Sequence, residues 1–523
     1  MNTVEAWFSV VPLTACALPT LLALVGVFAP LRAGLASGGA LGGALLFTLL
    51  AGVTRGATGV TGLGVRVDAV TCVMLILVTA LGAIVVRYSR TYLHGDPGLG
   101  RYLRWLLLTL SAVTTLVIAN NLAVVALGWT ATSLALHQLL TFFGDRTAAR
   151  VAAHKKFLVS RLADALLLAC LGLIYRSTDS LELDRIAAWA SAHPELSPSM
   201  HVAAVLVVFA VALKSAQLPF HGWLTQVMEA PTPVSALLHA GVVNIGGFVL
   251  IRLSPLMAHA GPAQLLLVVI GLSSAIVAAL VMTTRVSVKV ALAWSTIAQM
   301  GFMLVQCGLG LWHLALLHLV AHSLYKAHAF LSAGTAVHGW LLGSATRRPA
   351  SPSPARLVGL VFVTLGVAAL GFVALRQTGF AAAGVNDFSG PGLTLLVALA
   401  LVPLLARGSS NVAALARSTG VVLLFAGWHA AAAQLMPVPL AASNALVWAL
   451  VCAGFVGLFV TKATMQLFPE GRLARTLYPW LFAGLYLDER FTRLTFRVWP
   501  PRLQRPSARR DPLYASETLE SHT

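Results

Sequence analysis

The chain has 523 residues, of which 58% are hydrophobic and only 10% are charged, and its mean hydropathy is +0.85. Soluble domains carry roughly a quarter of their residues as Asp, Glu, Lys and Arg, and they do not contain one apolar run of about 20 residues after another. The composition therefore excludes a water-soluble globular protein and predicts an all-α, polytopic membrane protein.

The net charge is +18, from 35 Lys and Arg against 17 Asp and Glu. In a soluble protein this excess would suggest nucleic acid, but here the basic residues lie between apolar runs, where they set orientation. We therefore expect membrane lipid around the chain and no nucleic acid as a partner. The five cysteines lie singly within apolar runs, which is typical of buried apolar side chains and not of disulfides or metal ligands.

The apolar runs predict about 15 membrane-spanning helices. Those within residues 1–64 precede a core over 65–340, and further spans lie within 341–464. Residues 465–506 are aromatic and basic, which predicts a cytoplasmic amphipathic segment, and the polar residues 507–523 predict a disordered tail. The predicted spans are 10–29, 33–53, 68–87, 104–119, 122–143, 157–175, 202–219, 234–254, 263–282, 289–308, 313–340, 357–375, 391–406, 418–435 and 443–462.

Basic residues gather in alternate loops between these spans, whereas the longest opposite loop, 176–200, is acidic. The positive-inside rule then predicts a multi-pass protein of the cell inner membrane, with its N-terminus outside and its C-terminus in the cytoplasm. No basic residue precedes the first apolar stretch, so we expect the first helix to stay in the protein. The loops assigned to the cytoplasm carry Arg32, Arg87, Arg90, Arg101, Arg104, Arg146, Arg150, Lys155, Lys156, Arg161, Arg285, Arg347, Arg348, Arg356, Arg407 and Arg417.

Lys214 lies at the end of an apolar run, and a polar interruption, FHGWLTQVMEAPTP, follows it. Pro219, Pro231 and Pro233 flank this interruption. Proline leaves backbone carbonyls without a partner, which a membrane tolerates only where they face protein or water. The pattern predicts a discontinuous helix whose lysine handles ions, and snorkelling of Lys214 to the membrane edge is an equal alternative.

His318, His322 and Lys326 are spaced i, i+4, i+8 and share one helical face. We favour a proton relay over a structural face or a metal site, because no third metal ligand and no HExxH arrangement accompanies the histidine pair. His239 is a lone histidine in the next span after the interruption, and Lys289 begins a later helix, where it can snorkel. We expect no metal site here.

Arg161 and Asp164 are spaced i, i+3, so they can pair within the membrane. A structural ion pair and an electrostatic partner for Lys214 are equally compatible with the sequence. The chain has no Gly-rich phosphate loop, no CxxCH and no zinc-finger spacing, so we expect no cofactor in it and no enzymatic activity of its own.

Four segments together resemble a known family: KSAQLPFHGWLTQVMEAPTPVSALLHA, VKVALAWSTIAQMGFM, LHLVAHSLYKAHAFLSAG and SRLAD. They are similar to the antiporter-like subunits of respiratory complex I, Mrp antiporters and membrane-bound hydrogenases, over roughly residues 65–340. The resemblance implies two inverted five-helix repeats, each with a discontinuous helix, that move H⁺ or Na⁺ along buried polar residues. It implies that Lys214 is the central lysine, His239 the connecting residue and Arg161 with Asp164 the ion pair of the first half-channel. The polar axis would consist of His318, His322 and Lys326.

The sequence departs from this family at two places. Where the family has GWE, with a glutamate that partners the central lysine, this chain has Thr130, and His137, Asp164 and Glu229 are the candidates to replace the acid. Nothing like the family's FFSKDE stretch follows Ala355, so the distal half-channel is expected to be altered or absent.

The GWT and KKFLVSRLAD segments and the ending LYLDERFTRLTFRVWP are similar to the DabB family, the membrane subunits of DabA–DabB inorganic carbon pumps. This resemblance implies a large DabA-like partner with a zinc site like that of a β-type carbonic anhydrase. The present chain would then couple H⁺ or Na⁺ flux to CO₂ hydration by that partner, which we expect to bind the segment 472–502.

Three other functions remain open: a proton-pumping subunit of a complex I-like or hydrogenase complex, an Mrp-type Na⁺/H⁺ antiporter subunit, and a scaffold for the partner. The complex I subunit of the family has a long lateral helix, for which we expect no room in 523 residues, and this argues against the first function. Thr130 in place of the acid argues against the second. The intramembrane Lys and His residues argue against the third.

Overall fold

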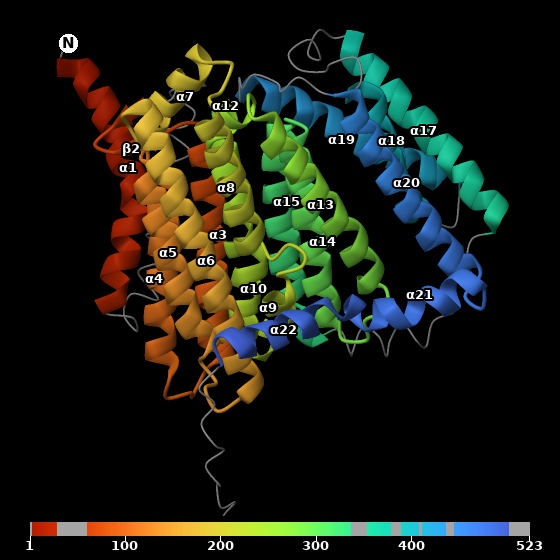
Figure 1. The fold of residues 1–523 in the computed structure, drawn as a ribbon, viewed down its shortest axis with the longest axis horizontal. Coiled ribbons are helices and arrows are strands. Elements are labelled where there is room, and N and C mark those ends of the chain that lie inside the picture. The colour runs from red at the N-terminus through yellow and green to blue at the C-terminus, as the bar shows by residue number, and fades with distance from the viewer. Residues whose placement is uncertain are drawn as a thin grey trace, which may run out of the picture.

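The computed structural model describes residues 3–28, 60–335, 353–377, 389–406, 411–435 and 444–500, and within them it is a helical bundle (Figure 1). The described strands are β1 (Val60–Gly62) and β2 (Val65–Val67), which pair antiparallel as a short hairpin. The predicted all-α membrane class is thus confirmed.

The first helices of the bundle are α1 (Thr3–Phe28), α3 (Ala69–Tyr92), α4 (Leu99–Ile118), α5 (Leu122–Leu140), α6 (Thr147–Thr178), α7 (Leu183–Ala192) and α8 (Pro198–Lys214). The middle of the chain forms α9 (Gly222–Gln226), η1 (Val227–Glu229), α10 (Thr232–Ala240), η2 (Val242–Asn244), α11 (Ile245–Arg252), α12 (Ser254–Met257), α13 (Gly261–Met282), α14 (Val288–Gly308), α15 (Trp312–Leu331) and η3 (Ala333–Thr335). The last part forms α17 (Pro354–Gln377), α18 (Ser389–Ala406), α19 (Asn411–Leu435), α20 (Ala445–Leu467), α21 (Arg472–Phe482), η4 (Gly484–Tyr486) and α22 (Leu487–Val498).

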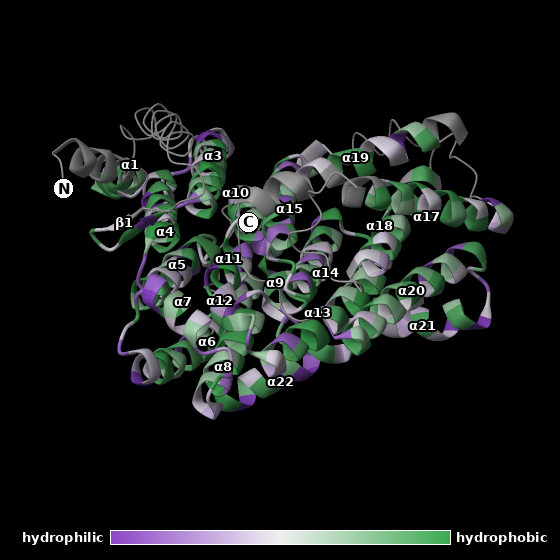
Figure 2. Cartoon of the chain, turned by 90° about the horizontal axis from the view of Figure 1, so that it is seen from above, coloured by the Kyte–Doolittle hydropathy of each residue, from purple (hydrophilic) through white to green (hydrophobic). Residues whose placement is uncertain are grey.

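Nine helices among the described residues are long and apolar enough to cross a membrane, and four shorter apolar helices accompany them. Each predicted span falls on a described helix, with one exception, the predicted span 33–53, which lies outside the described residues. Most residues of the described helices are hydrophobic (Figure 2), as is usual for helices that cross a membrane.

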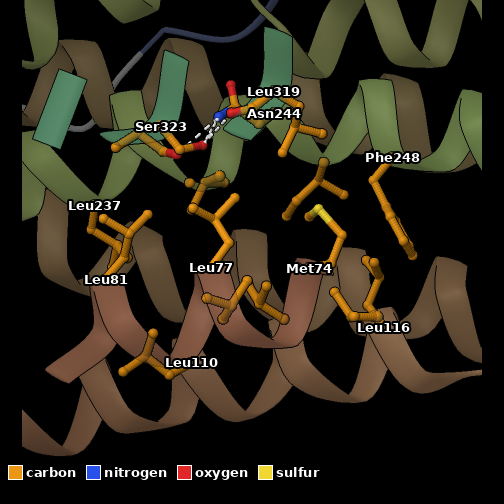
Figure 3. A pocket seen from close by; sticks show the side chains of 17 residues that line it. Met74, Leu77, Leu81, Leu110, Leu116, Leu237, Asn244, Phe248, Leu319 and Ser323 are labelled. Carbon is orange, nitrogen blue, oxygen red and sulfur yellow. Dashed lines mark hydrogen bonds between the residues drawn. The ribbon is translucent and has the colours of Figure 1, made fainter. Parts of the chain in front are cut away.

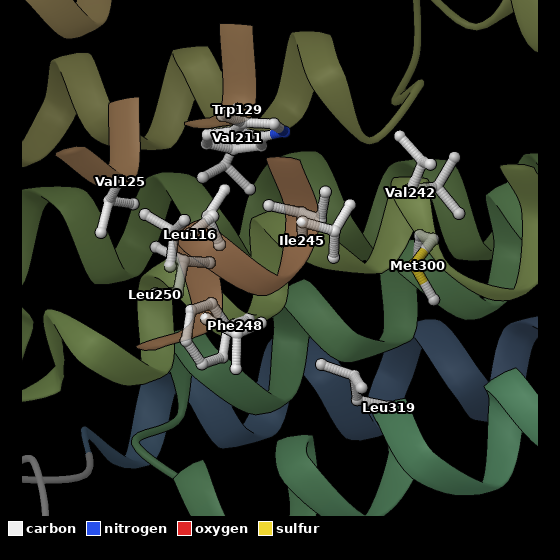
Figure 4. Packing of buried hydrophobic residues seen from close by; sticks show 14 of the residues in the cluster. Leu116, Val125, Trp129, Val211, Val242, Ile245, Phe248, Leu250, Met300 and Leu319 are labelled. Carbon is white, nitrogen blue, oxygen red and sulfur yellow. The ribbon is translucent and has the colours of Figure 1, made fainter. Parts of the chain in front are cut away.

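The core of the bundle is apolar and tightly packed. Trp129 on α5, Val211 on α8, Phe248 on α11 and Met300 on α14 belong to one buried cluster (Figure 4). Small residues bring helices together elsewhere: a Cβ added to Gly271 on α13 would lie 2.5 Å from the carbonyl oxygen of Gly301 on α14. Such close backbone contact is how helices associate where lipid removes the hydrophobic driving force.

The helices α21 and α22 run across one end of the bundle and return beneath α6 and α9 (Figure 1). Leu485 and Tyr486 have positive φ values of 58° and 54°, which turns the chain between the two helices. We call this side of the molecule the α22 end. It also holds the loop between α5 and α6.

The structure corrects the place of two basic residues. Lys155 and Lys156 were assigned to a cytoplasmic loop, but α6 begins at Thr147, so both lysines lie within a helix and are buried, with 0% and 3% exposure. Averaged hydropathy places the start of this span at residue 157, because two adjacent lysines lower the mean value. The average does not register that both side chains point into protein.

Candidate ion-translocation site

The site is built around an interruption between two helices. Helix α8 ends at Lys214, irregular backbone follows, and the short α9 and η1 lead to α10. Pro219 lies in the irregular stretch, whereas Pro231 and Pro233 lie at the start of α10. The predicted discontinuous helix is confirmed at the predicted residues.

A second interruption was not predicted. Gly241, with φ −123° and ψ −66°, separates α10 from η2 and α11 within a single apolar stretch. A Cβ at this position would lie 2.9 Å from the carbonyl oxygen of Leu237, so a residue with a side chain would not fit without a shift of the backbone. The signal was present in the sequence as a glycine directly after the His-Ala pair that ends α10.

Lys214 is buried, and its ammonium group pairs with a carboxylate of α6. Its Nζ lies 2.5 Å from Oδ1 of Asp164, and Oδ2 of the same carboxylate lies 2.7 Å from Nη2 of Arg161. The Lys214 Nζ also lies 4.6 Å from the ring centroid of Trp129, one face of which can attract a cation. The snorkelling alternative is therefore wrong, because the side chain of Lys214 is only 3% exposed.

The structure distinguishes between the three groups that could replace the missing acid at Thr130. Asp164 contacts Lys214 directly, whereas Glu229 pairs with Arg146 at 3.1 Å on an exposed surface. His137 lies two turns further along α5, with its ring 5.6 Å from that of Phe157.

Lys156 is a buried cation that the sequence pattern does not distinguish from a loop residue. Its Nζ donates to the carbonyl oxygen of Ser133 at 2.5 Å and to the hydroxyl of Ser133 at 2.8 Å. Ser133 is one turn from Trp129 on α5, and Lys156 is two turns from Asp164 on α6. Two lysines, Lys156 and Lys214, thus lie along the same α5–α6 interface.

His239 lies in the last turn of α10 and is fully buried. Its Nδ1 lies 3.1 Å from Oγ1 of Thr296 on α14, and its ring stacks on Phe330 with centroids 4.3 Å apart. Its carbonyl oxygen accepts a hydrogen bond of 3.1 Å from Nε2 of His322. A hydrogen bond from the side chain of His322 to the backbone of His239 therefore connects two of the predicted site residues.

The polar face of α15 points toward α14. Nδ1 of His322 lies 2.5 Å from Oε1 of Gln299, and Nδ1 of His318 lies 3.0 Å from Oε1 of Gln306. Lys326 donates to the carbonyl oxygen of Leu292 at 3.0 Å. The amide partners were missed in the sequence, although the two glutamines lie seven residues apart and so share a face of α14.

Lys289, at the start of α14, donates to Oγ1 of Thr232 at 2.9 Å. It therefore joins α14 to the first turn of α10, beside the interruption. Among the described residues, no group of three or more His, Cys, Asp or Glu is arranged to hold a metal ion.

An apolar cavity of about 30 Å³ lies beside this polar face, between α3, α4, α10, α11 and α15 (Figure 3). Asn244 and Ser323 reach its wall, but their side chains hydrogen bond to each other at 2.7 Å. The rest of its wall consists mainly of leucine, valine, methionine and phenylalanine side chains, and cavities of this kind stay dry.

The end of the bundle opposite α22 holds a partly buried ion-pair network. Arg252 at the end of α11 donates to both carboxylate oxygens of Asp68, at 2.6 and 3.1 Å. Arg66 joins the same carboxylate to Asp184. Burial alone would raise the pKa of Asp68, but Arg252 and Arg66 together hold it well below its usual range.

Comparison with known proteins places this geometry in a family. A model described as "NADH:quinone oxidoreductase/Mrp antiporter, TM" matches residues 119–347, and one described as "NADH-Ubiquinone oxidoreductase (complex I), chain 5 N-terminus" matches residues 59–103. The chain is 41% identical to the probable inorganic carbon transporter subunit DabB2 of Halothiobacillus neapolitanus, over 87% of this chain and 84% of that protein. The chain belongs to the DabB family.

Other relatives agree with this assignment. The probable inorganic carbon transporter subunit DabB of Hydrogenovibrio crunogenus is 38% identical over 85% of each chain. NADH-quinone oxidoreductase subunit L of Rhodobacter capsulatus is 36% identical, over 53% of this chain and 41% of that protein. The similarity to these two DabB proteins covers a larger share of the chain than the similarity to subunit L of Rhodobacter capsulatus.

A solved structure, that of the Mrp complex from Dietzia sp., shares the fold with a TM-score of 0.54 and 23% identity. All of this chain is covered by the match, which spans 58% of the Mrp chain. The DabB-family chain therefore has the antiporter-like membrane fold that the sequence motifs predicted.

Proposed function

We propose that this DabB-family chain is the cation-translocating membrane subunit of an inorganic carbon pump, which couples H⁺ or Na⁺ entry to CO₂ hydration by a DabA-type partner. The observation that carries the proposal is the buried Lys214–Asp164 pair at the break between α8 and α9. Charged side chains at bilayer depth are costly and mark ion pathways. The names of the two DabB relatives support the carbon cargo.

Lys214 is the switchable charge in this mechanism. When a cation enters the first half-channel, it competes with the Lys214 ammonium group for Asp164, and the lysine then turns away or loses its proton. Arg161 keeps the carboxylate partly neutralised while this happens, because it holds the other oxygen. The exchange needs no large movement of helices, because the irregular backbone after Lys214 lets the end of α8 adjust.

His239 passes the change toward α15. Its carbonyl holds Nε2 of His322, so movement of the end of α10 changes the position of that ring. The amide of Gln299 can accept from a protonated Nδ1 or, when turned, donate to an unprotonated one. His322 thus has a partner in both protonation states, and His318, Lys326 and Lys289 continue the relay.

The partner carries out the hydration chemistry, with zinc expected in that subunit. The chain lies in the cell inner membrane in this proposal, with the N-terminus outside and the α22 end in the cytoplasm, where a DabA-type protein reaches α21 and α22. Exposed Tyr478, Trp480 and Trp499 on this segment are of the residue types that dominate protein interfaces.

The test is to purify the tagged chain in mild detergent, identify the proteins that accompany it by mass spectrometry and measure zinc on the same sample. A single large zinc-containing partner is the expected result. In cells that depend on the complex, Lys214→Ala should abolish inorganic carbon uptake without loss of the partner, whereas Arg104→Ala on the exposed face of α4 should not. Retained uptake in Lys214→Ala would overturn the mechanism.

A second function, a proton-pumping subunit of a complex I-like or hydrogenase complex or of an Mrp-type antiporter, is favoured by the match to subunit L and by the family model over residues 119–347. It predicts iron–sulfur subunits or further antiporter subunits in the purified sample. That result would replace the carbon-pump proposal.

A further inference from the structure

We propose that Lys156 is a second proton-carrying lysine, which loads the Lys214–Asp164 pair from the α22 end. The inference rests on the proposed function, because it adds a step to the same ion path. The charges at the α5–α6 interface are unbalanced. The three cations there repel one another, and the nearby carboxylate is that of Asp164. These cations are Lys156, Arg161 and Lys214.

Both oxygens of that carboxylate are already taken, by Lys214 and by Arg161. Lys156 is 3% exposed, and its described hydrogen-bond partner is Ser133 alone. Burying a cation without a counter-ion costs several kcal/mol. Loss of a proton from Lys156 would remove one buried positive charge and so lower this cost. We therefore infer that the side chain is a free amine for part of the time.

The surroundings of Lys156 suit both of its forms. The carbonyl oxygen of Ser133 accepts a hydrogen bond from the ammonium group or from the amine. The hydroxyl of Ser133 accepts from the ammonium group and can rotate to donate to the lone pair of the amine. The neighbouring Lys155 differs, because its Nζ lies 2.7 Å from Oδ1 of Asp488 and 2.7 Å from Oγ1 of Thr492, so its ammonium form has a counter-ion.

The positions along the two helices form a path. Lys156, Ser160 and Asp164 lie at i, i+4 and i+8 on α6, so they share a face and extend over about 12 Å. On α5, His137, Ser133 and Trp129 lie at the same spacing on the facing side. His137 is nearest the α22 end, and Trp129 contacts Lys214. Lys156 thus lies between the end of the bundle and the central pair.

The step that we propose moves one proton and no electrons. The free amine of Lys156 takes a proton from a hydronium ion that enters beside His137, so that an O–H bond breaks, an N–H bond forms and a neutral water molecule is left. The ammonium group then releases this proton, through the hydroxyls of Ser133 and Ser160 or water between them, to Asp164 when Lys214 has moved away. The charged and titratable groups that face Lys156 are His137 on α5, Arg161 and Asp164 on α6, and Lys214 on α8.

The test uses the intact complex in proteoliposomes, with proton flux followed by a pH-sensitive dye while the pH is varied on each side separately. Lys156→Met, Lys156→Gln and Lys156→Arg should each slow the flux at least tenfold. Gln and Arg keep a hydrogen bond to Ser133, so a purely structural lysine would tolerate one of them. In Lys156→Met, the dependence of residual flux on pH at the α22 end should flatten, while the dependence on the other side stays.

Arg104→Met is the matched control, since it removes an exposed positive charge from α4 at the same end. Lys214→Ala is measured in parallel to separate this inference from the proposed function. If Lys214→Ala is inactive and a Lys156 variant keeps its flux, only the role of Lys156 is overturned; if both keep it, the ion-translocation proposal fails. Flux that survives in Lys156→Arg and depends on chloride or bicarbonate would instead make Lys156 part of an anion site and overturn the loading step.

Discussion

The substitution Asp164→Asn removes the carboxylate from the central pair while keeping the shape of the side chain. In the protein, Lys214 and Arg161 both contact this carboxylate, and the side chains of Lys214 and Asp164 are 3% and 13% exposed. After the substitution, Lys214 keeps the face of Trp129 but loses its counter-ion. The buried ammonium group then has to be moved, neutralised or destabilised.

The size of the effect follows from the distance. At 2.5 Å and an effective dielectric constant of about 20, the attraction between the two charges is about 7 kcal/mol before the cost of desolvation. Breaking a buried pair by removing one partner costs about 3 to 5 kcal/mol in practice. At 1.4 kcal/mol per tenfold change, this corresponds to a shift of roughly 100-fold to several thousand-fold in the equilibrium between the paired and unpaired lysine.

We therefore expect Asp164→Asn to slow cation flux at least 100-fold in proteoliposomes that contain the intact complex. Asp164→Glu, which keeps the charge on a longer side chain, should retain part of the flux. Glu195→Gln, on an exposed loop, is the control for loss of a negative charge. Wild-type flux in Asp164→Asn, in protein shown to be assembled, would refute the role of the pair.

Three further predictions concern the ends of the bundle. Asp488→Asn leaves a fully buried lysine of α6 without its carboxylate, which should weaken the docking of α22 by about 3 kcal/mol. The weaker docking would be measured as faster hydrogen exchange in α22. The exposed Glu489→Gln should leave the exchange rate unchanged, and equal exchange in both variants would contradict the docking contact. Gly222→Ala should loosen α22 in the same assay, because a Cβ there would overlap the carboxylate of Asp488. Arg252→Met should lower the unfolding temperature, because it leaves Asp68 with one cation fewer. Since the folded pKa of Asp68 lies below its usual value, the stability that this pair contributes is present above about pH 4 and is lost only as the pH falls further. The loss of stability in Arg252→Met should therefore be constant from about pH 5 to 8. A steep change within that range would show that another group is responsible.

Several features of this protein follow from local sequence. Apolar runs of sufficient length must become helices in lipid, because each backbone group needs a partner within its own segment. The break after Lys214 was also predictable, since proline and a run of polar residues cannot continue a membrane helix. Arg161 and Asp164 could be paired because a spacing of three residues places side chains on one helical face.

The tertiary structure decided which acid serves Lys214. Asp164 lies 50 residues away in the chain, and nothing in the spacing distinguishes it from Glu229 or His137. The outcome depends on how α6 packs against α8, which brings one carboxylate within reach and leaves Glu229 with Arg146. Lys156 is buried where α6 packs against Ser133 of α5, although averaged hydropathy placed this lysine in a loop.

The position of α22 was likewise not available from the sequence. Its aromatic and basic residues predict an amphipathic helix, but the contact of Asp488 with Lys155 and Gln226 joins residues more than 260 positions apart. Local propensity and hydropathy determine which segments are helical and which residues are costly to bury. Only the packing of distant helices determines which of those costly residues meet, and therefore which charges can form an ion path.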